Sequence, residues 1–186
     1  MIDKSLLFLK DELNSFIQYK TGIAGKVILC PIVDESGKVI ISKDAIGLSL
    51  INIDEEKILK EQTPWQNGSL GTSNPEIKIN LFILFTANFG DYQESLKFIS
   101  HVISYFQSNS VFEQSKYPRL YEGIEKLVLE LYSLSFEQQN QLWSTIGTKY
   151  LPSVLFKVKA LVFKESQLSG IETGVSGING ELYNKS

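Results

Sequence analysis

The stretch from residue 77 to residue 85 constrains the fold more than any other part of this sequence. It begins as an alternation of apolar and polar residues and becomes apolar at every position from Leu81 to Phe85. Alternation is typical of a β-strand, and the change to apolar residues on both faces predicts a strand inside a sheet that is covered on both sides. The apolar run is far shorter than the roughly 20 residues that cross a membrane as a helix. We therefore expect a soluble domain built around this strand.

Three segments carry the pattern of amphipathic helices. Apolar residues recur at steps of three and four over residues 2–20, and Gly22 offers the left-handed conformation that ends such a helix. Asp91 and Ser135 each precede a further helical segment in the pattern of a capping box. We expect these side chains on the buried faces of the second and third helices: Tyr92, Leu96, Ile99, Ile103 and Phe106, then Phe136, Trp143 and Ile146.

Several short segments have the composition and alternation of strands. They cover residues 26–33, 38–42, 46–53, 77–85, 111–113, 124–132 and 154–163, with a turn at 34–37 and a long loop at 62–76. Because not every strand is followed by a helix, the pattern predicts an α+β fold with a mixed β-sheet flanked by about three helices. We expect one domain over residues 1–163, and a tail or arm rich in Gly and Ser over residues 164–186.

Charge and cysteine content exclude some classes of protein. The chain has 18 Lys and Arg against 21 Asp and Glu, a net charge of −3, which argues against binding to nucleic acid. Its single cysteine, Cys30, lies in an apolar run and is typical of a small core residue in a reducing compartment. The N-terminus enters an amphipathic pattern without a signal peptide, so synthesis in the bacterial cytoplasm is expected.

The sequence offers no motif for catalysis, for a cofactor or for a metal ion. Residues 22–27 resemble a phosphate-binding loop, but the glycines are too close and the segment follows a helix instead of a strand. His101 is the only histidine, so a metal site would lack ligands. The carboxylates of residues 54–56 are typical of a solvated turn. An enzymatic site assembled from distant amide, carboxylate or hydroxyl groups stays open as an alternative.

Aromatic and apolar residues outside the regular elements indicate contacts with other proteins. Tyr, Trp and Arg are enriched at protein interfaces, and several of them lie here beside prolines in loops. The alternatives are a loop that packs on its own domain and a terminus without a partner. The candidate interface residues are Trp65, Tyr117, Arg119, Tyr121 and Tyr150, with Ile171, Val175, Ile178 and Leu182 spaced along the tail.

One block resembles a known family. Residues 127–143 read LVLELYSLSFEQQNQLW, and the block continues through Gly147 to YLPSV at residues 150–154. It is similar to the N-terminal domain of cap, or tube-terminator, proteins of contractile injection systems such as the antifeeding prophage and related phage-tail-like particles. NIDEE at residues 52–56, INLFILF at residues 79–85 and the opening helix fit the same resemblance, which covers about residues 2–163.

The resemblance implies a structural role without catalytic residues. Proteins of this family form a hexameric ring on the distal end of the inner tube, stop tube and sheath growth, and connect the last sheath ring to the tube. It therefore implies copies of this chain, the inner tube protein and the sheath protein as partners, with no nucleic acid, membrane or cofactor. Two alternatives stay open: a terminator or connector of a contractile phage tail, and a small ligand-binding or enzymatic α+β domain.

Overall fold

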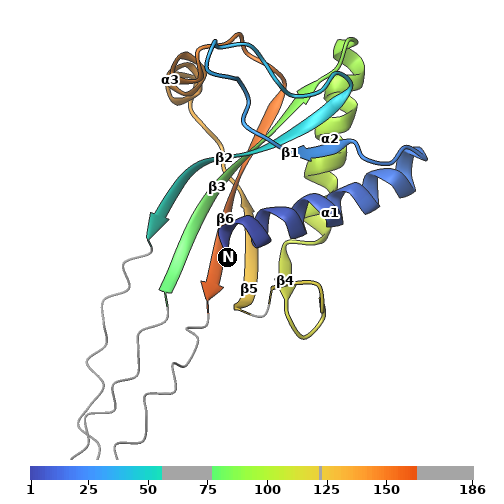
Figure 1. Cartoon of the computed structure of the whole chain (residues 1–186), viewed down its shortest axis with the longest axis vertical. Helices are drawn as coiled ribbons and strands as arrows, with labels where there is room; N and C mark the ends of the chain where they lie inside the picture. The colour runs from blue at the N-terminus through green and yellow to red at the C-terminus, as the bar shows by residue number, and fades with distance from the viewer. Residues whose placement is uncertain (56–76, 122, 163–186) are drawn as a thin grey trace, which may run out of the picture.

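A six-stranded mixed sheet with helices on both faces forms the body of the molecule (Figure 1). The structure is a computed structural model that describes residues 1–55, 77–121 and 123–162. Its strands are ordered β1-β2-β3-β6-β5-β4, with β1 parallel to β2 and every other pair antiparallel. The helices are α1 (Ile2–Thr21), α2 (Tyr92–Ser108) and α3 (Phe136–Ile146). The strands are β1 (Val27–Leu29), β2 (Ala45–Glu55), β3 (Ile77–Asn88), β4 (Val111–Glu113), β5 (Ile124–Leu131) and β6 (Ser153–Val162).

The central position expected for residues 77–85 is confirmed. β3 lies between β2 and β6, and its alternate side chains enter two separate clusters. Ile83 and Phe85 pack with α1 and α2 on one face, whereas Phe82 and Leu84 pack with α3 on the other. Because successive side chains of a strand point to opposite faces, a strand covered on both sides must be apolar at every position.

The residues that the sequence analysis expected at the ends of the helices are found there. Gly22 ends α1 in the left-handed conformation, with φ 73°. Asp91 caps α2 by accepting a hydrogen bond from the Gln93 N–H at 3.0 Å, although Glu94 pairs with a lysine of the next turn instead of completing a capping box. Ser135 begins α3 in a full capping box with Gln138.

The hairpin expected between residues 26 and 42 forms only next to its turn, where the Ile40 N–H donates to the Ile32 carbonyl oxygen and the Asp34 N–H to the Lys38 carbonyl oxygen. Only Val27–Leu29 form a strand, and the predicted return strand contributes a single bridge between Val33 and Val39. Because β1 and β2 run parallel, the chain between them must cross from one end of the sheet to the other, so the return segment does not join the sheet beside β1. The crossing segment instead lies over the sheet, where Ile32 and Ile41 are buried against α3.

Three side chains expected on buried helical faces are exposed. The exposed fractions are 63% for Tyr92, 44% for Leu96 and 92% for Phe136. The buried face of α2 is rotated relative to the expectation because the helix contacts both α1 and the sheet. Its buried residues are Ser95, Phe98, Ile99, Val102, Tyr105 and Phe106.

Candidate interaction surfaces

The two reactive side chains singled out by the sequence lie on opposite faces of the sheet. Cys30 packs beside the α3 cluster, and burial raises the pKa of its thiol. His101 contacts the rings of Phe16 and Phe98, and burial together with nearby lysines lowers the pKa of its imidazole. They therefore do not form a Cys–His pair, and no group of three His, Cys, Asp or Glu residues within the described ranges is arranged to hold a metal ion.

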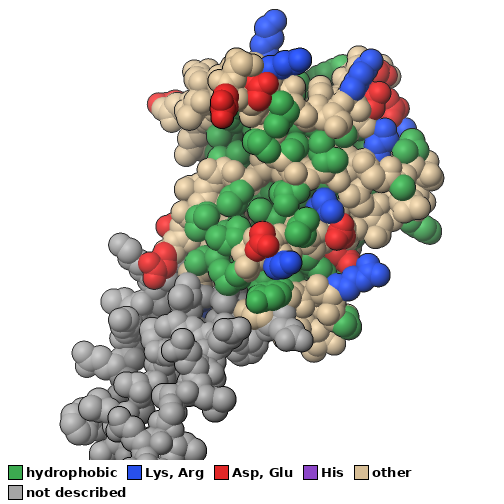
Figure 2. All heavy atoms as spheres, in the orientation of Figure 1, with side chains coloured by type: hydrophobic (Ala, Val, Ile, Leu, Met, Phe, Trp, Pro, Cys, Tyr) green, Lys and Arg blue, Asp and Glu red, His purple; other side chains and the backbone are tan. Residues whose placement is uncertain are grey.

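Formal charge is mixed on the surface. On the face that Figure 2 shows, Lys and Arg side chains alternate with Asp and Glu and leave hydrophobic side chains exposed in the middle. Within the part of the chain that the structure describes, no helix is long and apolar enough to span a membrane.

The first surface involves the segment that follows β4. Tyr117 packs edge-on against Phe8 and Phe112, with ring centroids 5.9 and 4.9 Å apart, and Leu120 is buried beside them. These contacts fix the segment to the domain and leave its neighbour Arg119 exposed. An anchored loop presents its exposed side chains at little cost in conformational entropy, which suits binding.

A shallow groove of about 340 Å³ separates this segment from α1. We call it the α1 groove; it is lined by Lys4, Leu7, Phe8, Asp11, Glu12, Arg119 and Tyr121. Glu12 also accepts a hydrogen bond from the Tyr105 hydroxyl at 3.3 Å. Burial, followed by the nearby Glu12 charge, raises the pKa of Tyr105 well above its ordinary value, so this phenol stays protonated.

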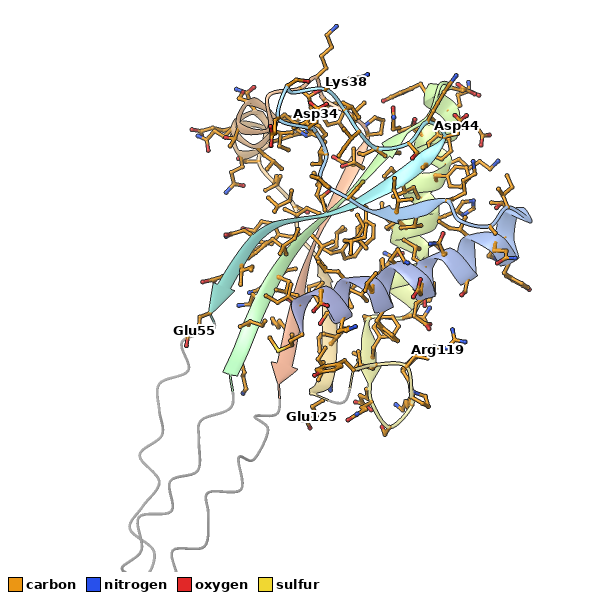
Figure 3. All side chains as sticks on the ribbon, in the orientation of Figure 1. Asp34, Lys38, Asp44, Glu55, Arg119 and Glu125 are labelled. Atoms are coloured by element: carbon orange, nitrogen blue, oxygen red, sulfur yellow. The ribbon has the colours of Figure 1, made fainter. Side chains whose placement is uncertain are left out.

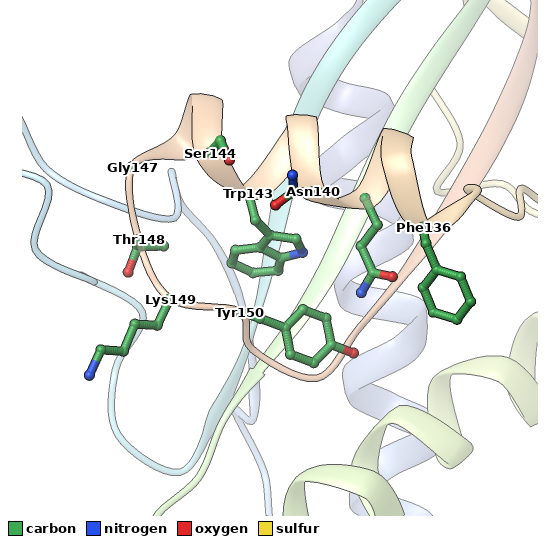
Figure 4. Close-up of a pocket in the computed structure, with 9 residues that line it drawn as sticks. Phe136, Asn140, Trp143, Ser144, Gly147, Thr148, Lys149 and Tyr150 are labelled. Atoms are coloured by element: carbon green, nitrogen blue, oxygen red, sulfur yellow. The ribbon is translucent and has the colours of Figure 1, made fainter.

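A second and larger groove runs along α3. This α3 groove encloses about 610 Å³ and is lined by Phe136, Gln139, Asn140, Trp143, Ser144, Gly147, Thr148, Lys149 and Tyr150. Figure 4 shows the Trp143 and Tyr150 rings side by side in the middle, with Phe136 near one end and Lys149 near the other. The two central rings meet edge to face, with centroids 5.5 Å apart.

The sequence around α3 explains this geometry. The capping box at Ser135 fixes the first turn and places Phe136 at the first helical position, beyond the sheet that would bury it. Gly147 ends the helix with φ 77°, which is a conformation that only glycine adopts without strain, and its N–H donates to the Trp143 carbonyl oxygen. The chain then turns back, so that Tyr150 lies against Trp143.

The α3 groove continues into a second hollow of about 350 Å³ that shares Gln139, Trp143 and Tyr150 with it. The other lining residues of this hollow are uncharged: Leu84, Ile103, Leu131, Tyr132, Ser133, Leu134, Leu142, Ser153, Val154 and Leu155. Leu131 and Tyr132 are exposed, and the Tyr132 ring meets Phe82 at 5.2 Å. Together the two hollows form a surface of mixed apolar and uncharged polar side chains, and Lys149 is the one lining residue with a formal charge.

The structure separates the predicted interface residues. Arg119 lies at one end of the molecule in Figure 3, and Lys38 lies at the other, beside α3. Tyr117, Arg119 and Tyr121 therefore cluster away from Tyr150, which belongs to the α3 groove. The remaining candidates lie outside the described residues: Trp65, Ile171, Val175, Ile178 and Leu182. The sequence analysis missed Phe136, and its place directly after a cap residue is the signal that marks it as exposed.

Two solved structures of proteins from contractile particles have a fold similar to that of this chain. The sheath/tube terminator of the PVC extracellular contractile injection system, in its extended state, matches with a TM-score of 0.54 and 15% identity over 97% of this chain and 64% of that one. The tube-terminating cap of the anti-feeding prophage matches with a TM-score of 0.51 and 13% identity over 93% of this chain and 61% of that one. This chain therefore spans less than two thirds of either structure.

The sequence match is more specific than the fold. The chain belongs to the Pvc16 N-terminal domain family, which it matches over residues 7–175. No curated protein matches it. The resemblance noted at residues 127–154 is therefore confirmed at the level of the family.

Proposed function

We propose that this chain is a structural cap, or tube and sheath terminator, of a contractile injection system and not an enzyme. The single observation that carries the proposal is the family match over residues 7–175. The fold supports it, because the two similar structures are a sheath/tube terminator and a tube-terminating cap and each aligns with more than nine tenths of this chain. The chain would then be made in the bacterial cytoplasm and act as part of an assembled contractile particle.

The resemblance implies that six copies of the chain form a ring. A closed ring uses head-to-tail contacts, so each copy needs two different surfaces that face different neighbours. The α1 groove and the α3 groove would be such a pair, since α1 and α3 pack on opposite faces of the sheet. Each contact between neighbours should bury at least about 1,000 Å² in total to hold the ring. One face of the ring would match the last layer of the inner tube, and the other would offer the tube protein no matching surface.

The link to the sheath is assigned to residues 164–186. This segment carries Ile171, Val175, Ile178 and Leu182 among glycines, a composition suited to a segment that orders when it binds. Residues 1–163 would then act as the ring-forming domain. Trp65 is proposed as a further contact residue in the loop at 62–76.

Particle assembly with and without this chain tests the role. Particles built from tube and sheath proteins alone should vary in length and lose the sheath, whereas adding the chain should give one length, a six-fold ring at the end, and a retained sheath. Electron microscopy measures all three. Uniform length and an attached sheath in the absence of this chain would contradict the proposal. A matched variant that ends at residue 164 separates the functions: it should still set the length but retain less sheath.

A further inference from the structure

We propose that the outer edge of β2 over residues 50–55 accepts an added β-strand from another protein, and that this strand carries two consecutive basic residues next to an apolar one. We call this part of the strand the β2 edge. The inference goes beyond the terminator role and does not depend on it. It rests on the backbone groups, side chains and charges of the described residues at this edge.

The β2 edge is open because β1 is much shorter than β2. β1 pairs with residues 46–48 only, and the Cys30 N–H adds one hydrogen bond to the Leu48 carbonyl oxygen. The chain then leaves the sheet, and Ile32 packs against α3. In Figure 1 the lower half of β2 therefore runs past the end of β1 at the margin of the sheet.

Backbone groups along the β2 edge point away from the sheet. The N–H and C=O groups of successive residues in a strand alternate between its two neighbours. The Ile46 N–H donates to the Lys26 carbonyl oxygen on the β1 side, so the even-numbered residues face outward as far as Leu50. The register shift that follows moves the outward positions to Ile53 and Glu55. No described residue donates to or accepts from these outward groups.

An extended backbone is the ligand that matches such a row of groups. Unpaired N–H and C=O groups at an exposed edge are a template for an added strand, and many proteins bind extended segments in this way. Residues 50–55 span about 16 Å at about 3.3 Å per residue. A partner segment of about five residues therefore covers the β2 edge.

The side chains of the β2 edge select the side chains of the partner. Ile53 is 48% exposed, and Asp54 and Glu55 are also exposed. Because successive side chains point to opposite faces, Asp54 lies on one face and the other two lie on the other. Opposite charges on paired strands stabilise the pairing, and like charges destabilise it. The favoured partner therefore places two consecutive basic residues beside the carboxylates and an apolar residue beside Ile53.

The described residues around the two carboxylates do not neutralise them. Neither Asp54 nor Glu55 forms an ion pair with a residue that the structure describes. Lys78 on β3 and Lys159 on β6 lie one and two strands inside the edge, and Lys159 pairs with a glutamate of β5. In Figure 3 the charged turn at residues 34–38 lies at the opposite end of the view from Glu55. The β2 edge is therefore acidic.

A second copy of this chain fits the β2 edge less well than a basic segment does. Two such edges that paired with each other would bring the carboxylates of both copies to one shared edge. Like charges brought together oppose association, whereas complementary charges favour it. The charge of the edge thus points to a segment of a different protein.

Amide hydrogen exchange of the full chain, followed residue by residue by NMR, tests whether the edge is open and where a partner binds. The Ile53 and Glu55 N–H groups should exchange quickly in the free chain, because water reaches an open edge. The probe is a capped six-residue peptide with two central lysines, each flanked by a valine and then a threonine, so that it reads alike in either direction. At saturation it should slow the exchange of both N–H groups at least about tenfold.

Two matched peptides separate the sources of binding. In the first, glutamates replace the lysines; it should bind at least about threefold more weakly at low salt, and the difference should fade at high salt. In the second, methyl groups on the backbone nitrogens remove the donors and leave the side chains as they were. This peptide should not slow exchange at Ile53 or Glu55, because it cannot form the hydrogen bonds of a strand pair.

Charge reversal then locates the site. The double variant Asp54→Lys, Glu55→Lys should reverse the preference, so that the peptide with glutamates binds better. Glu125→Lys is the matched control and should leave the preference unchanged, because Glu125 is an exposed carboxylate on β5, which has a neighbouring strand on each side. The replaced side chains are exposed, so the fold should persist, which circular dichroism checks.

Three results would overturn the proposal. The first is the absence of saturable binding by the peptide with lysines. The second is binding that the methylated peptide reproduces, or a charge preference that the double variant does not reverse. The third is slow exchange at Ile53 and Glu55 before any peptide is added. In that case the chain itself or a second copy covers the edge, and light scattering distinguishes the two.

Discussion

A side chain of α1 closes the outer edge of the sheet, and its removal gives the sharpest test of the fold. Asn14 Nδ2 donates to the Val27 carbonyl oxygen, and the Val27 N–H donates to Asn14 Oδ1, each at 2.8 Å. The amide thereby takes the place of a neighbouring strand at β1, which lies at the end of the sheet. Asn14→Ala removes both hydrogen bonds and changes nothing else in the backbone.

The expected loss follows from these contacts. A net contribution of about 1 kcal/mol for each hydrogen bond gives about 2 kcal/mol. Val27 is 2% exposed, so its freed N–H and C=O groups are poorly placed to find water, which adds about 1 kcal/mol or more. Alanine is a better helix former than asparagine by about 0.6 kcal/mol, and this gain offsets part of the loss. We therefore expect Asn14→Ala to lower the free energy of unfolding by about 2–3 kcal/mol.

Urea unfolding followed by circular dichroism measures this change. Ser15→Ala is the matched control, because Ser15 is the next residue of α1 and its hydroxyl donates only to the Asp11 carbonyl oxygen of its own helix. The control should change the free energy of unfolding by less than about 0.5 kcal/mol. If both variants lose the same amount, or if Asn14→Ala loses less than about 0.5 kcal/mol, the amide does not hold the edge of the sheet.

Three further changes test other parts of the fold. Gly47→Ala would place a methyl group 2.7 Å from the buried Ile41 side chain and should cost about 1–3 kcal/mol in urea unfolding. Ser135→Ala removes the cap of α3 and should cost about 1 kcal/mol and lower helical ellipticity. Folding lowers the pKa of His101 from its ordinary value of 6.5, so the folded state favours the neutral imidazole. The free energy of unfolding should therefore fall as the pH drops below 6.5 and the imidazole becomes protonated. His101→Leu should flatten this slope between pH 5 and 7, and an unchanged slope would contradict it.

Patterns within a single element were predictable from the sequence, and contacts between elements were not. The strand at residues 77–85 and the cap at Ser135 depend on residues within a few positions of one another, and both are confirmed. The pairing of Asn14 with Val27 depends on how α1 docks against β1, and neither residue type indicates this contact in the sequence. The α3 groove was partly predictable, since Tyr150 was a candidate, but its shape requires the turn after Gly147 to bring that ring back to the helix.

The hairpin expected at residues 26–42 is shorter than its pattern predicts and lies outside the sheet, which shows where local pattern fails. A turn of Asp, Ser and Gly between two apolar runs is the ordinary signal of a hairpin, and the Asp34 carboxylate does accept hydrogen bonds from the Ser36 and Lys38 N–H groups. The Ser36 hydroxyl, which also donates to this carboxylate at 2.6 Å, and then these N–H groups hold the pKa of Asp34 below its usual value. The turn is therefore correct, but of the two runs on either side of it only Val27–Leu29 joins the sheet, where it pairs parallel to β2. Strand direction depends on the whole sheet, so no window of this length encodes it.

The edges of the sheet bear on how copies of this chain can meet. Exposed edges invite pairing with another chain, and proteins limit this with short strands and charged residues. β1 and β4 have three residues each; Asn14 covers β1, and Glu113 on β4 pairs with Lys116 and Lys126. Pairing with another chain at the β1 edge would first have to break the two hydrogen bonds between Asn14 and Val27. Neighbouring copies should therefore meet through side-chain surfaces such as the two grooves, and Asn14→Ala should make the chain more prone to uncontrolled association while leaving the α3 groove intact.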